Sequence, residues 1–474
     1  MLITLIQKEI MHHILSVRFI ALLLMCALLI PLTFSISYRK YTQNLTDYQE
    51  SVNRSRSETK VNPPNAQDPD VEVSKLFLKP TPLSVFANGL EEVLPTYLGM
   101  TRNGIRTGST ALAQAPLAYV LGNLDFLFIV GTVFSLLALL FTFDAVAGER
   151  EAGTLRINLS NPVPRDVFLW SKLIGGYVVF VIPFLVSFLL GLLLIVWQGF
   201  PLGELKIAMP VLGLTLVSLL YIAVFFAIGV VISTYLDNSK TALIVAFTFW
   251  VFAVLIAPRG AFIVAKLVSP TRTQQTVYME KTALRNNLAK EKQEKLNKKI
   301  FEIFGTNLAI TPEVQKRLDK IRKPINEESR LKFQNQANKI DNGYQREKDR
   351  QEHIGEVLSR FVPTSSLIYS AINLTQTGKL KRDTYFQTGE RYYKQLDDSY
   401  FSGISDDVMA QVVQIMDRQR NNLSESEEIP PPPTVTESAL SDTVRRSAVD
   451  VFLLGFFALA FTVVAFLKFL RSDI

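Results

Sequence analysis

Apolar and polar stretches alternate along the chain, and six of the apolar runs are long enough to cross a membrane. A helix rises about 1.5 Å per residue, so roughly 20 consecutive apolar residues span the hydrocarbon of a bilayer. The pattern therefore predicts an all-α polytopic membrane protein with six transmembrane helices. Their predicted bounds are 19–37, 124–143, 167–197, 207–234, 241–258 and 447–470.

Residues 1–18 precede the first span and carry apolar side chains at helical spacing, with polar residues from Lys8 to His13 between them. This pattern is typical of an amphipathic helix that lies in the membrane interface. The segment from Glu9 to His13 matches neither orientation of the zinc-protease motif, so we assign it no metal. A small-residue cleavage site is missing from the first apolar run, which indicates that the first span itself directs insertion.

Residues 38–123 form a first polar region, rich in Asn, Ser, Asp and Pro, which is predicted to leave the membrane. Its part around residues 61–70 has the composition of a disordered segment. Pro80 and Pro82 favour an extended backbone. The apolar residues that follow, from Leu83 to Leu90, could then pack a short helix against the membrane surface.

Residues 259–446 form a second, larger polar region, expected to be mainly helical. Within residues 271–304, apolar positions recur mostly every four or seven residues, which predicts a long amphipathic helix. A second helix is expected at residues 313–361 with a break at Pro324, and the two together predict an antiparallel hairpin. We interpret the many charges as solvated helix faces, with lipid or polymer binding as the alternative. A polyproline stretch at residues 428–433 suits a stiff spacer.

The composition excludes several functional classes. The chain has 474 residues, of which 48% are apolar and 20% charged, and this is not the composition of a soluble enzyme. Its net charge of +7 is dispersed rather than gathered with aromatic residues, so we expect no nucleic-acid partner. Cys26 is the single cysteine, which excludes an intrachain disulfide and a cysteine-based metal site.

The sequence also bears on whether this chain is driven by its own ATP hydrolysis or by an ion gradient. No phosphate-binding G-x-x-x-x-G-K-[ST] loop occurs, so we expect this chain not to hydrolyse ATP. The spans carry few ionisable residues near their centres, which disfavours an ion-coupled carrier. The sequence therefore predicts a membrane subunit that something else moves.

Residues 144–166 form a short, charge-dense segment between the second and third spans, here named the coupling loop. Glu149 to Glu151 are expected in the first turn of a short helix, where acidic groups suit the positive end of the helix dipole. Gly148 would let the chain turn into this helix, and Asn161, Pro162 and Pro164 would end it. The alternative is a solvated loop that merely connects two spans.

The coupling loop carries a family resemblance. Residues 144–156 (DAVAGEREAGTLR), residues 159–165 (LSNPVPR), Lys172 and the following Gly175-Gly176 closely resemble the first cytoplasmic loop of ABC-2 type permeases, the membrane subunits of ABC exporters. The resemblance implies that this loop docks on a separate ATPase subunit and transmits nucleotide-driven closure. The residues implied in this coupling are Asp144, Gly148, Glu149, Arg150, Glu151, Gly153, Thr154, Arg156, Asn161, Pro162 and Arg165.

The same resemblance implies the partners. ATP and magnesium would be bound by the ATPase subunit, and no cofactor by this chain. A second permease subunit, identical or related, and membrane lipid would complete the complex. Residues 79–91, 361–369 and 471–474 resemble one ABC-2 subgroup with large extracytoplasmic insertions, which includes permeases grouped with copper-enzyme maturation and gliding motility.

Orientation follows from the resemblance, because the basic residues near the span ends number nine on one side and eight on the other and hardly discriminate. A loop that faces an ATPase puts both termini in the cytoplasm, in a bacterial plasma (inner) membrane, with both polar regions extracytoplasmic. We therefore expect a multi-pass permease subunit of an ABC exporter that exports or extracts an amphipathic substrate.

One alternative stays open, in which the complex transports nothing and transmits an ATP-driven mechanical signal to an extracytoplasmic protein partner. An enzyme acting within the membrane is disfavoured, because no nucleophile–base pair or metal-ligand cluster is evident.

Overall fold

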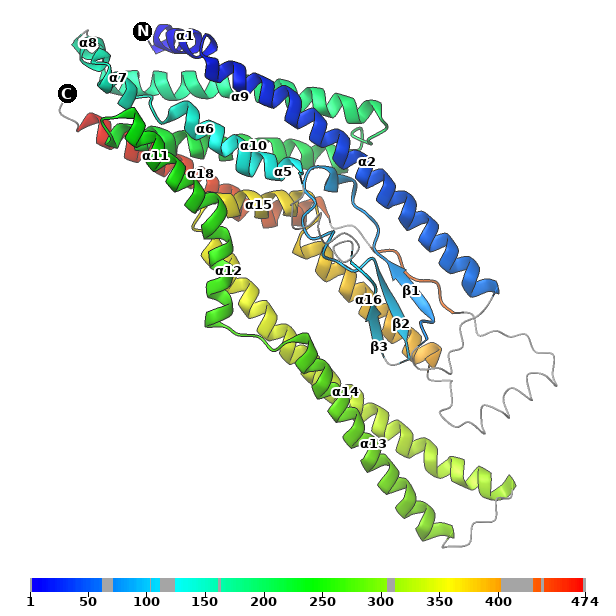
Figure 1. The fold of residues 1–474 in the computed structure, drawn as a ribbon. Coiled ribbons are helices and arrows are strands. Elements are labelled where there is room, and N and C mark those ends of the chain that lie inside the picture. The colour runs from blue at the N-terminus through cyan, green and yellow to red at the C-terminus, as the bar shows by residue number, and fades with distance from the viewer. Residues whose placement is uncertain are drawn as a thin grey trace. The chain divides into compact units, whose positions relative to one another are not determined.

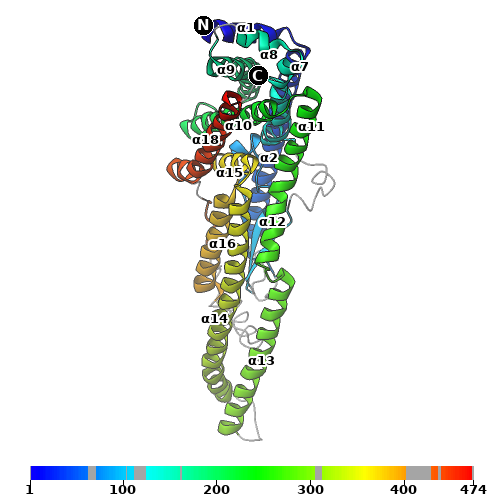
Figure 2. The same cartoon turned by 90° about the vertical axis from the view of Figure 1, so that its left-hand side faces the viewer.

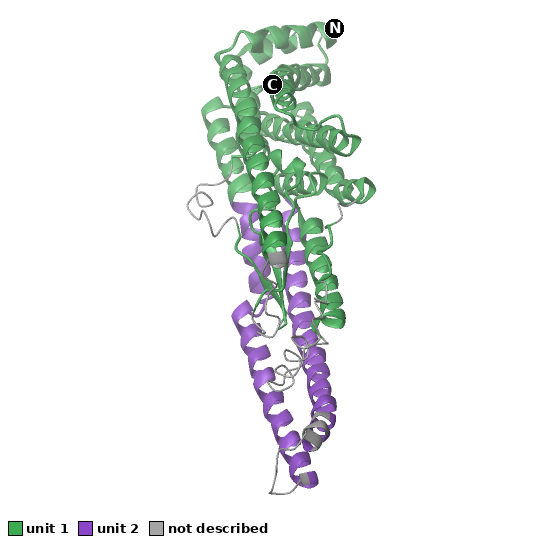
Figure 3. Ribbon diagram, turned by 90° about the vertical axis from the view of Figure 1, so that its right-hand side faces the viewer, with its two compact units in different colours: residues 1–255, 362–474 green, residues 256–361 purple. Residues whose placement is uncertain are grey.

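The computed structural model describes residues 2–61, 71–102, 104–110, 124–160, 163–304, 312–401, 429–435 and 439–471. The chain forms two compact units (Figure 3): unit 1 comprises residues 1–255 and 362–474, and unit 2 residues 256–361. Within the described residues, six helices are long and apolar enough to cross a membrane, which confirms an all-α polytopic membrane protein. They are Val17–Glu58, Phe126–Glu151, Arg165–Trp197, Leu205–Tyr235, Ser239–Val268 and Leu440–Leu470.

Unit 1 is a helical bundle (Figure 1). Its principal helices are α1 (Leu2–Ile14), α2 (Val17–Val61), α6 (Ser135–Thr142), α9 (Arg165–Trp197), α10 (Leu205–Tyr235), α11 (Ser239–Trp250), α15 (Pro363–Leu374) and α18 (Leu440–Leu470). Helix α6 is preceded by α5 (Phe126–Phe128) and the π-helix η2 (Ile129–Phe134). Helix α1 and the C-terminal end of α18 lie at one end of the bundle, here named the termini end, and a small β-sheet lies toward the other, the sheet end.

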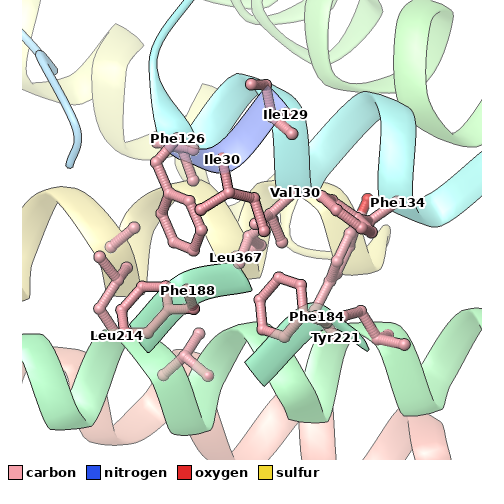
Figure 4. Close-up of a cluster of buried hydrophobic side chains, with 14 of the residues drawn as sticks. Ile30, Phe126, Ile129, Val130, Phe134, Phe184, Phe188, Leu214, Tyr221 and Leu367 are labelled. Carbon is pink, nitrogen blue, oxygen red and sulfur yellow. The ribbon is translucent and has the colours of Figure 1, made fainter. Parts of the chain in front are cut away.

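Phenylalanine dominates the core of unit 1. Figure 4 shows Phe126, Phe134, Phe184 and Phe188 from two spans gathered in one apolar cluster. The rings of Phe134 and Phe184 are 5.1 Å apart at 81°, an edge-to-face arrangement that aromatic quadrupoles favour. Gly229 allows α6 and α10 to approach closely, because a Cβ there would lie 1.8 Å from the Thr142 hydroxyl.

Two predicted span ends differ from the structure. The first predicted span, 19–37, lies within a longer helix, α2, which continues to Val61, because residues 38–61 contain neither Gly nor Pro and Tyr38 and Tyr41 are buried against the bundle. The predicted disorder at 61–70 lies outside the described residues beyond Val61. The helix also continues beyond the predicted end of the fifth span at Pro258: after the π-helix η3 (Val251–Ile256), Pro258 lies in the first turn of α12 (Ala257–Val268), where a missing N–H costs little.

The first polar region and part of the second join in one α/β module within unit 1. Strands β1 (Ser74–Phe77), β2 (Tyr97–Thr101) and β3 (Gly104–Thr107) form an antiparallel sheet in that order, which the sequence analysis did not predict. Helix α16 (Lys379–Ser399) packs on this sheet, and the Tyr385 hydroxyl donates to the Leu76 carbonyl at 3.1 Å. The polyproline segment also lies on the module, since the Tyr392 hydroxyl donates to the Pro430 carbonyl at 2.6 Å.

Unit 2 contains α12, α13 (Gln274–Phe304) and α14 (Pro312–Ser359), and Figure 2 shows α13 beside α14. The pairing is antiparallel, as the ion pairs Arg272–Glu347, Lys281–Asp341 and Lys295–Glu328 show at 3.1, 2.6 and 2.9 Å. The hairpin prediction is therefore confirmed. The break predicted at Pro324 is wrong, because α14 continues through this proline and the neighbouring Ile325 is buried.

Candidate functional site

The coupling loop forms two short helices rather than the single one predicted, α7 (Ala147–Glu151) and α8 (Thr154–Ser160). The break falls at Gly153, whose φ of +70° lies in the left-handed region that favours glycine. Gly148 was expected to make the turn into the helix, but it lies inside α7. Asn161 and Pro162, predicted to end the helix, lie outside the described residues.

A buried ion-pair triad anchors α7 to two other helices. The Lys172 ammonium of α9 lies 3.0 Å from the Glu9 carboxylate of α1 and also pairs with Glu149 of α7. Glu9 and Lys172 are 7% and 9% exposed, so water screens these charges little. Removing one partner of a buried ion pair costs roughly 3–5 kcal/mol, because the other charge stays buried. The triad therefore fixes α1, α7 and α9 relative to one another.

Asp144, at the start of the coupling loop, is held by the helix that follows α1. Arg18 donates to both carboxylate oxygens of Asp144, at 2.8 and 2.7 Å, in the two-pronged geometry that a guanidinium favours. The same guanidinium lies over the Phe143 ring at 5.1 Å. Asp144 is thus partnered within the chain.

The end of α10, the turn that follows it and the start of α11 also contact α7. The buried Ser233 hydroxyl accepts hydrogen bonds from the Val146 and Ala147 amides at 2.9 and 3.0 Å, and so caps the start of α7. Arg150 pairs with Asp237, and the Glu151 carboxylate accepts from the Ser239 amide at 3.0 Å. Three separate segments of the chain therefore position this five-residue helix.

Helix α8 is anchored on one face and open on the other. Leu155 is buried with Phe168 of α9 and Phe469 of α18. On the outer face, Thr154 and Arg156 are exposed, and the Ile157 side chain is 66% exposed. An exposed branched apolar side chain beside an arginine, on a firmly anchored helix, is a surface suited to a protein partner.

The structure thus divides the predicted coupling residues. Asp144, Glu149 and Arg150 make ion pairs inside the chain, and Arg165 donates to the Leu470 carbonyl at 3.2 Å. Glu151, Gly153, Thr154 and Arg156 are exposed. Sequence reasoning missed the pairing roles of Glu9, Arg18, Lys172, Ser233 and Asp237, because nothing local indicates partners that are as many as 163 residues apart, as Glu9 and Lys172 are.

A family model described as ABC-2 family transporter protein matches residues 3–474. The chain belongs to the ABC-2 transporter family. It is therefore a membrane subunit, the permease of an ABC transporter, and the family implies partnership with an ABC ATPase subunit. Such subunits are generally not enzymes themselves. No curated protein matches the chain.

Among the described residues of this permease, no group of three or more His, Cys, Asp or Glu side chains is arranged to hold a metal ion. His13 lies against the Phe141 ring at 5.5 Å, and burial lowers its pKa. At the termini end of the ABC-2 permease, Lys172 pairs with Glu9 and Glu149 inside the bundle, whereas the short helix α8 presents an exposed face.

Proposed function

We propose that this ABC-2 permease is the membrane subunit of an exporter in which α8 docks on the ATPase subunit and α7 passes the movement into the bundle. The observation that carries the proposal is the contrast between the exposed outer face of α8 and the internal ion pairs of α7. A docking element must present exposed side chains, whereas a transmitting element must be tied to the parts it moves.

The triad supports the transmission step. Force applied at α8 reaches α7 across Gly153, and α7 is tied to α9 and α1 through Glu149 and Lys172. Because Glu9 and Lys172 are buried and Glu149 is half-buried, α1, α7 and the start of α9 would move as one body. The amphipathic α1 would then slide along the membrane interface together with α9, rather than change its angle to α9.

Orientation and assembly form part of the proposal. With α8 on the ATPase, both termini lie in the cytoplasm of a bacterial inner membrane and the α/β module lies outside. Two permease subunits, identical or related, would combine with two ATPase subunits that carry ATP and magnesium. The three segments that resemble the subgroup with large insertions support a place in that subgroup. The exported substrate would be amphipathic, since the spans are mostly apolar.

The deciding experiment co-purifies the permease with its ATPase and compares Ile157→Glu with Asp237→Ala. Ile157→Glu places a charge on the outer face of α8 and should abolish association and the permease-dependent ATPase rate. Asp237→Ala removes an exposed partner of Arg150 and should change association little, because exposed pairs contribute little. Unchanged association in Ile157→Glu would overturn the docking role of α8.

A second function, mechanical signalling without transport, is favoured by the α/β module. The module combines segments that lie on both sides of the second to fifth spans in the sequence, so a movement of the bundle would reach a single external surface. Crosslinking in cells distinguishes the two functions. One dominant extracytoplasmic protein crosslinked to the module supports signalling, whereas export predicts substrate-stimulated ATP hydrolysis without such a partner.

A further inference from the structure

Unit 2 carries the positive charge of the chain. Residues 256–361 contain 22 Lys and Arg against 13 Asp and Glu, a net charge of +9, whereas the rest of the chain has a net charge of −2. The charge that the sequence analysis took to be dispersed is therefore concentrated in one helical unit. A surface of one sign attracts a partner of the opposite sign.

Ion pairs between α13 and α14 neutralise acidic residues in the middle of the hairpin. Glu291 and Glu328 each pair with both Lys295 and Lys332, at distances between 2.9 and 3.1 Å. Two carboxylates and two ammonium groups thus balance one another at this level of the hairpin. The surplus of basic residues has to lie elsewhere in the unit.

The register of the ion pairs defines the two ends of the hairpin. The pair Lys281–Asp341 lies nearer the base, and the pair Lys295–Glu328 lies further along both helices. Beyond it lie residues 296–303 of α13 and 317–327 of α14, here named the distal end. Because α13 has 31 residues, this end lies about 45 Å from the base. Charges are screened within about 8 Å at physiological ionic strength, so those of the distal end act on what lies next to it.

The distal end presents unpaired basic side chains. It contains six Lys and Arg against three Asp and Glu. Four of its lysines are exposed and make no ion pair within the described part of the chain: Lys298, Lys299, Lys320 and Lys323. An exposed lysine usually belongs to a solvated helix face, so these charges by themselves do not identify a partner.

Large apolar side chains are exposed beside these lysines. The Phe301 and Ile303 side chains are 64% and 53% exposed, and so they take little part in the pairing of α13 with α14. Phe301 follows Lys298 by three residues, and Ile303 follows Lys299 by four, so each apolar side chain shares a helix face with a lysine. Phenylalanine and isoleucine beside lysine are typical of helices that insert into the headgroup region of a membrane.

We propose that the distal end of the hairpin binds an anionic lipid surface. The lysines pair with lipid phosphates, and Phe301 and Ile303 enter the boundary between headgroups and acyl chains. A soluble anionic polymer would pair with the lysines but would leave both apolar side chains in water. This lipid-binding surface lies in unit 2 and is independent of the docking role proposed for α8.

The test places the full chain in phosphatidylcholine nanodiscs and measures its co-flotation with separate vesicles. One set of vesicles is phosphatidylcholine, and the other is an equal mixture of phosphatidylcholine and phosphatidylglycerol. We expect binding to the mixed vesicles only, and weaker binding as sodium chloride is added. Empty nanodiscs are the blank. Absence of binding to the mixed vesicles, or equal binding to both sets, would overturn the proposal.

Lys298→Gln/Lys299→Gln tests the charges of the distal end. The binding constant for the mixed vesicles should fall about 25-fold, since each basic residue near an anionic surface contributes a factor of about five. Lys339→Gln/Arg350→Gln is the matched control, because it removes two exposed basic side chains outside the distal end. The control should bind like the wild type, and equal losses in the two variants would mean that the distal end is not the contact.

Phe301→Ser/Ile303→Ser tests insertion into lipid. Binding to the mixed vesicles should fall more than about 10-fold, because two apolar side chains can no longer leave water. Tyr278→Ser/Met279→Ser is the matched control near the base of the hairpin, where these side chains are 71% and 63% exposed. Unchanged binding in the Phe301 and Ile303 variant would overturn the lipid surface and favour an anionic polymer.

Both distal variants change exposed side chains, so the melting temperature of the permease should stay the same. If a variant fails to fold, the comparison of the two vesicle sets with the wild type still decides whether an anionic lipid surface is bound. The flotation contains no ATPase. A failure of ATPase association therefore overturns the proposed function without affecting this result.

Discussion

Lysine–glutamate pairs occur in two regions of this permease, and their surroundings differ. At the termini end, the side chain of Lys172 is 8% exposed and lies between Glu9 and Glu149. In the hairpin of unit 2, the side chain of Lys295 is 41% exposed and lies between Glu291 and Glu328. Water and salt screen the second group but hardly the first. The same residue types therefore fix helices in one region and mainly provide a solvated surface in the other.

The largest effect is expected from Lys172→Met, which keeps the length of the side chain and removes its charge. Glu9 would then be buried, and Glu149 half-buried, without this counter-charge, at a loss of roughly 3–5 kcal/mol of stability. The measurement is the apparent melting temperature of the purified permease, together with protease access to α1. A clear fall in the melting temperature and release of α1 are expected.

Lys295→Met is the matched control for this comparison. It removes the same charge from an exposed network, and only a small change in melting temperature is expected. Equal falls in melting temperature for the two substitutions would show that burial does not determine how much these ion pairs stabilise the permease.

The sequence predicted the number of spans because each needs a long apolar run that few other structures use. It did not predict how far the helices extend beyond the apolar runs, since the polar residues after residue 37 continue α2 to Val61. It placed residues 363–374 in the second extracytoplasmic region, whereas they form helix α15, whose Leu367 and Ala371 are buried in the core of unit 1. The pairing of α16 with the sheet, exemplified by Tyr385 and Leu76, joins residues 309 positions apart, a distance at which no local pattern operates.

At the candidate site, the sequence predicted one short helix where the structure has two, α7 and α8, and it did not indicate which charged residues pair within the chain. The run from Glu149 to Glu151 reads as one charged surface, yet Glu149 and Arg150 pair inside the chain and Glu151 binds the Ser239 amide. Ile157 was not predicted as a site residue, because the sequence does not show whether an isolated apolar residue after a charged stretch is buried or exposed.

The next largest effect is expected from Ser233→Ala, which separates burial from charge. The Ser233 hydroxyl is uncharged but fully buried, and its loss leaves the amides of Val146 and Ala147 without an acceptor, at roughly 1–3 kcal/mol. A lower melting temperature, with faster hydrogen exchange in α7, would show that a buried contact stabilises α7 even when it carries no charge. Ser160→Ala, on the exposed side of α8, should leave both unchanged. Unaltered exchange in the Ser233 variant would mean that the ion pairs suffice.

The smallest effect is expected in the hairpin and depends on pH. Hydrogen bonds from Lys332, Lys295 and Arg272 lower the pKa values of Glu291, Glu328 and Glu347 below the ordinary value. Because the folded pKa values are lower than those of the unfolded chain, the contribution is fully present above about pH 4.5 and is lost as the pH falls through the lower folded values. Protection of α13 and α14 in hydrogen exchange, corrected for intrinsic rates, should decline in that acidic window.

The same hydrogen-exchange measurement can be repeated at different salt concentrations. Raising the ionic strength near neutral pH should weaken the exposed pairs of α13 and α14 and leave the protection of α1 and α7 unchanged, because screening reaches exposed charges and hardly reaches the buried triad. If α13 and α14 keep their protection in acid and in salt, the hairpin is held by its buried apolar residues, such as Leu288 and Ile325. The charges of the hairpin would then keep its surface hydrated without stabilising it, whereas the charge of Lys172 stabilises the helices around it.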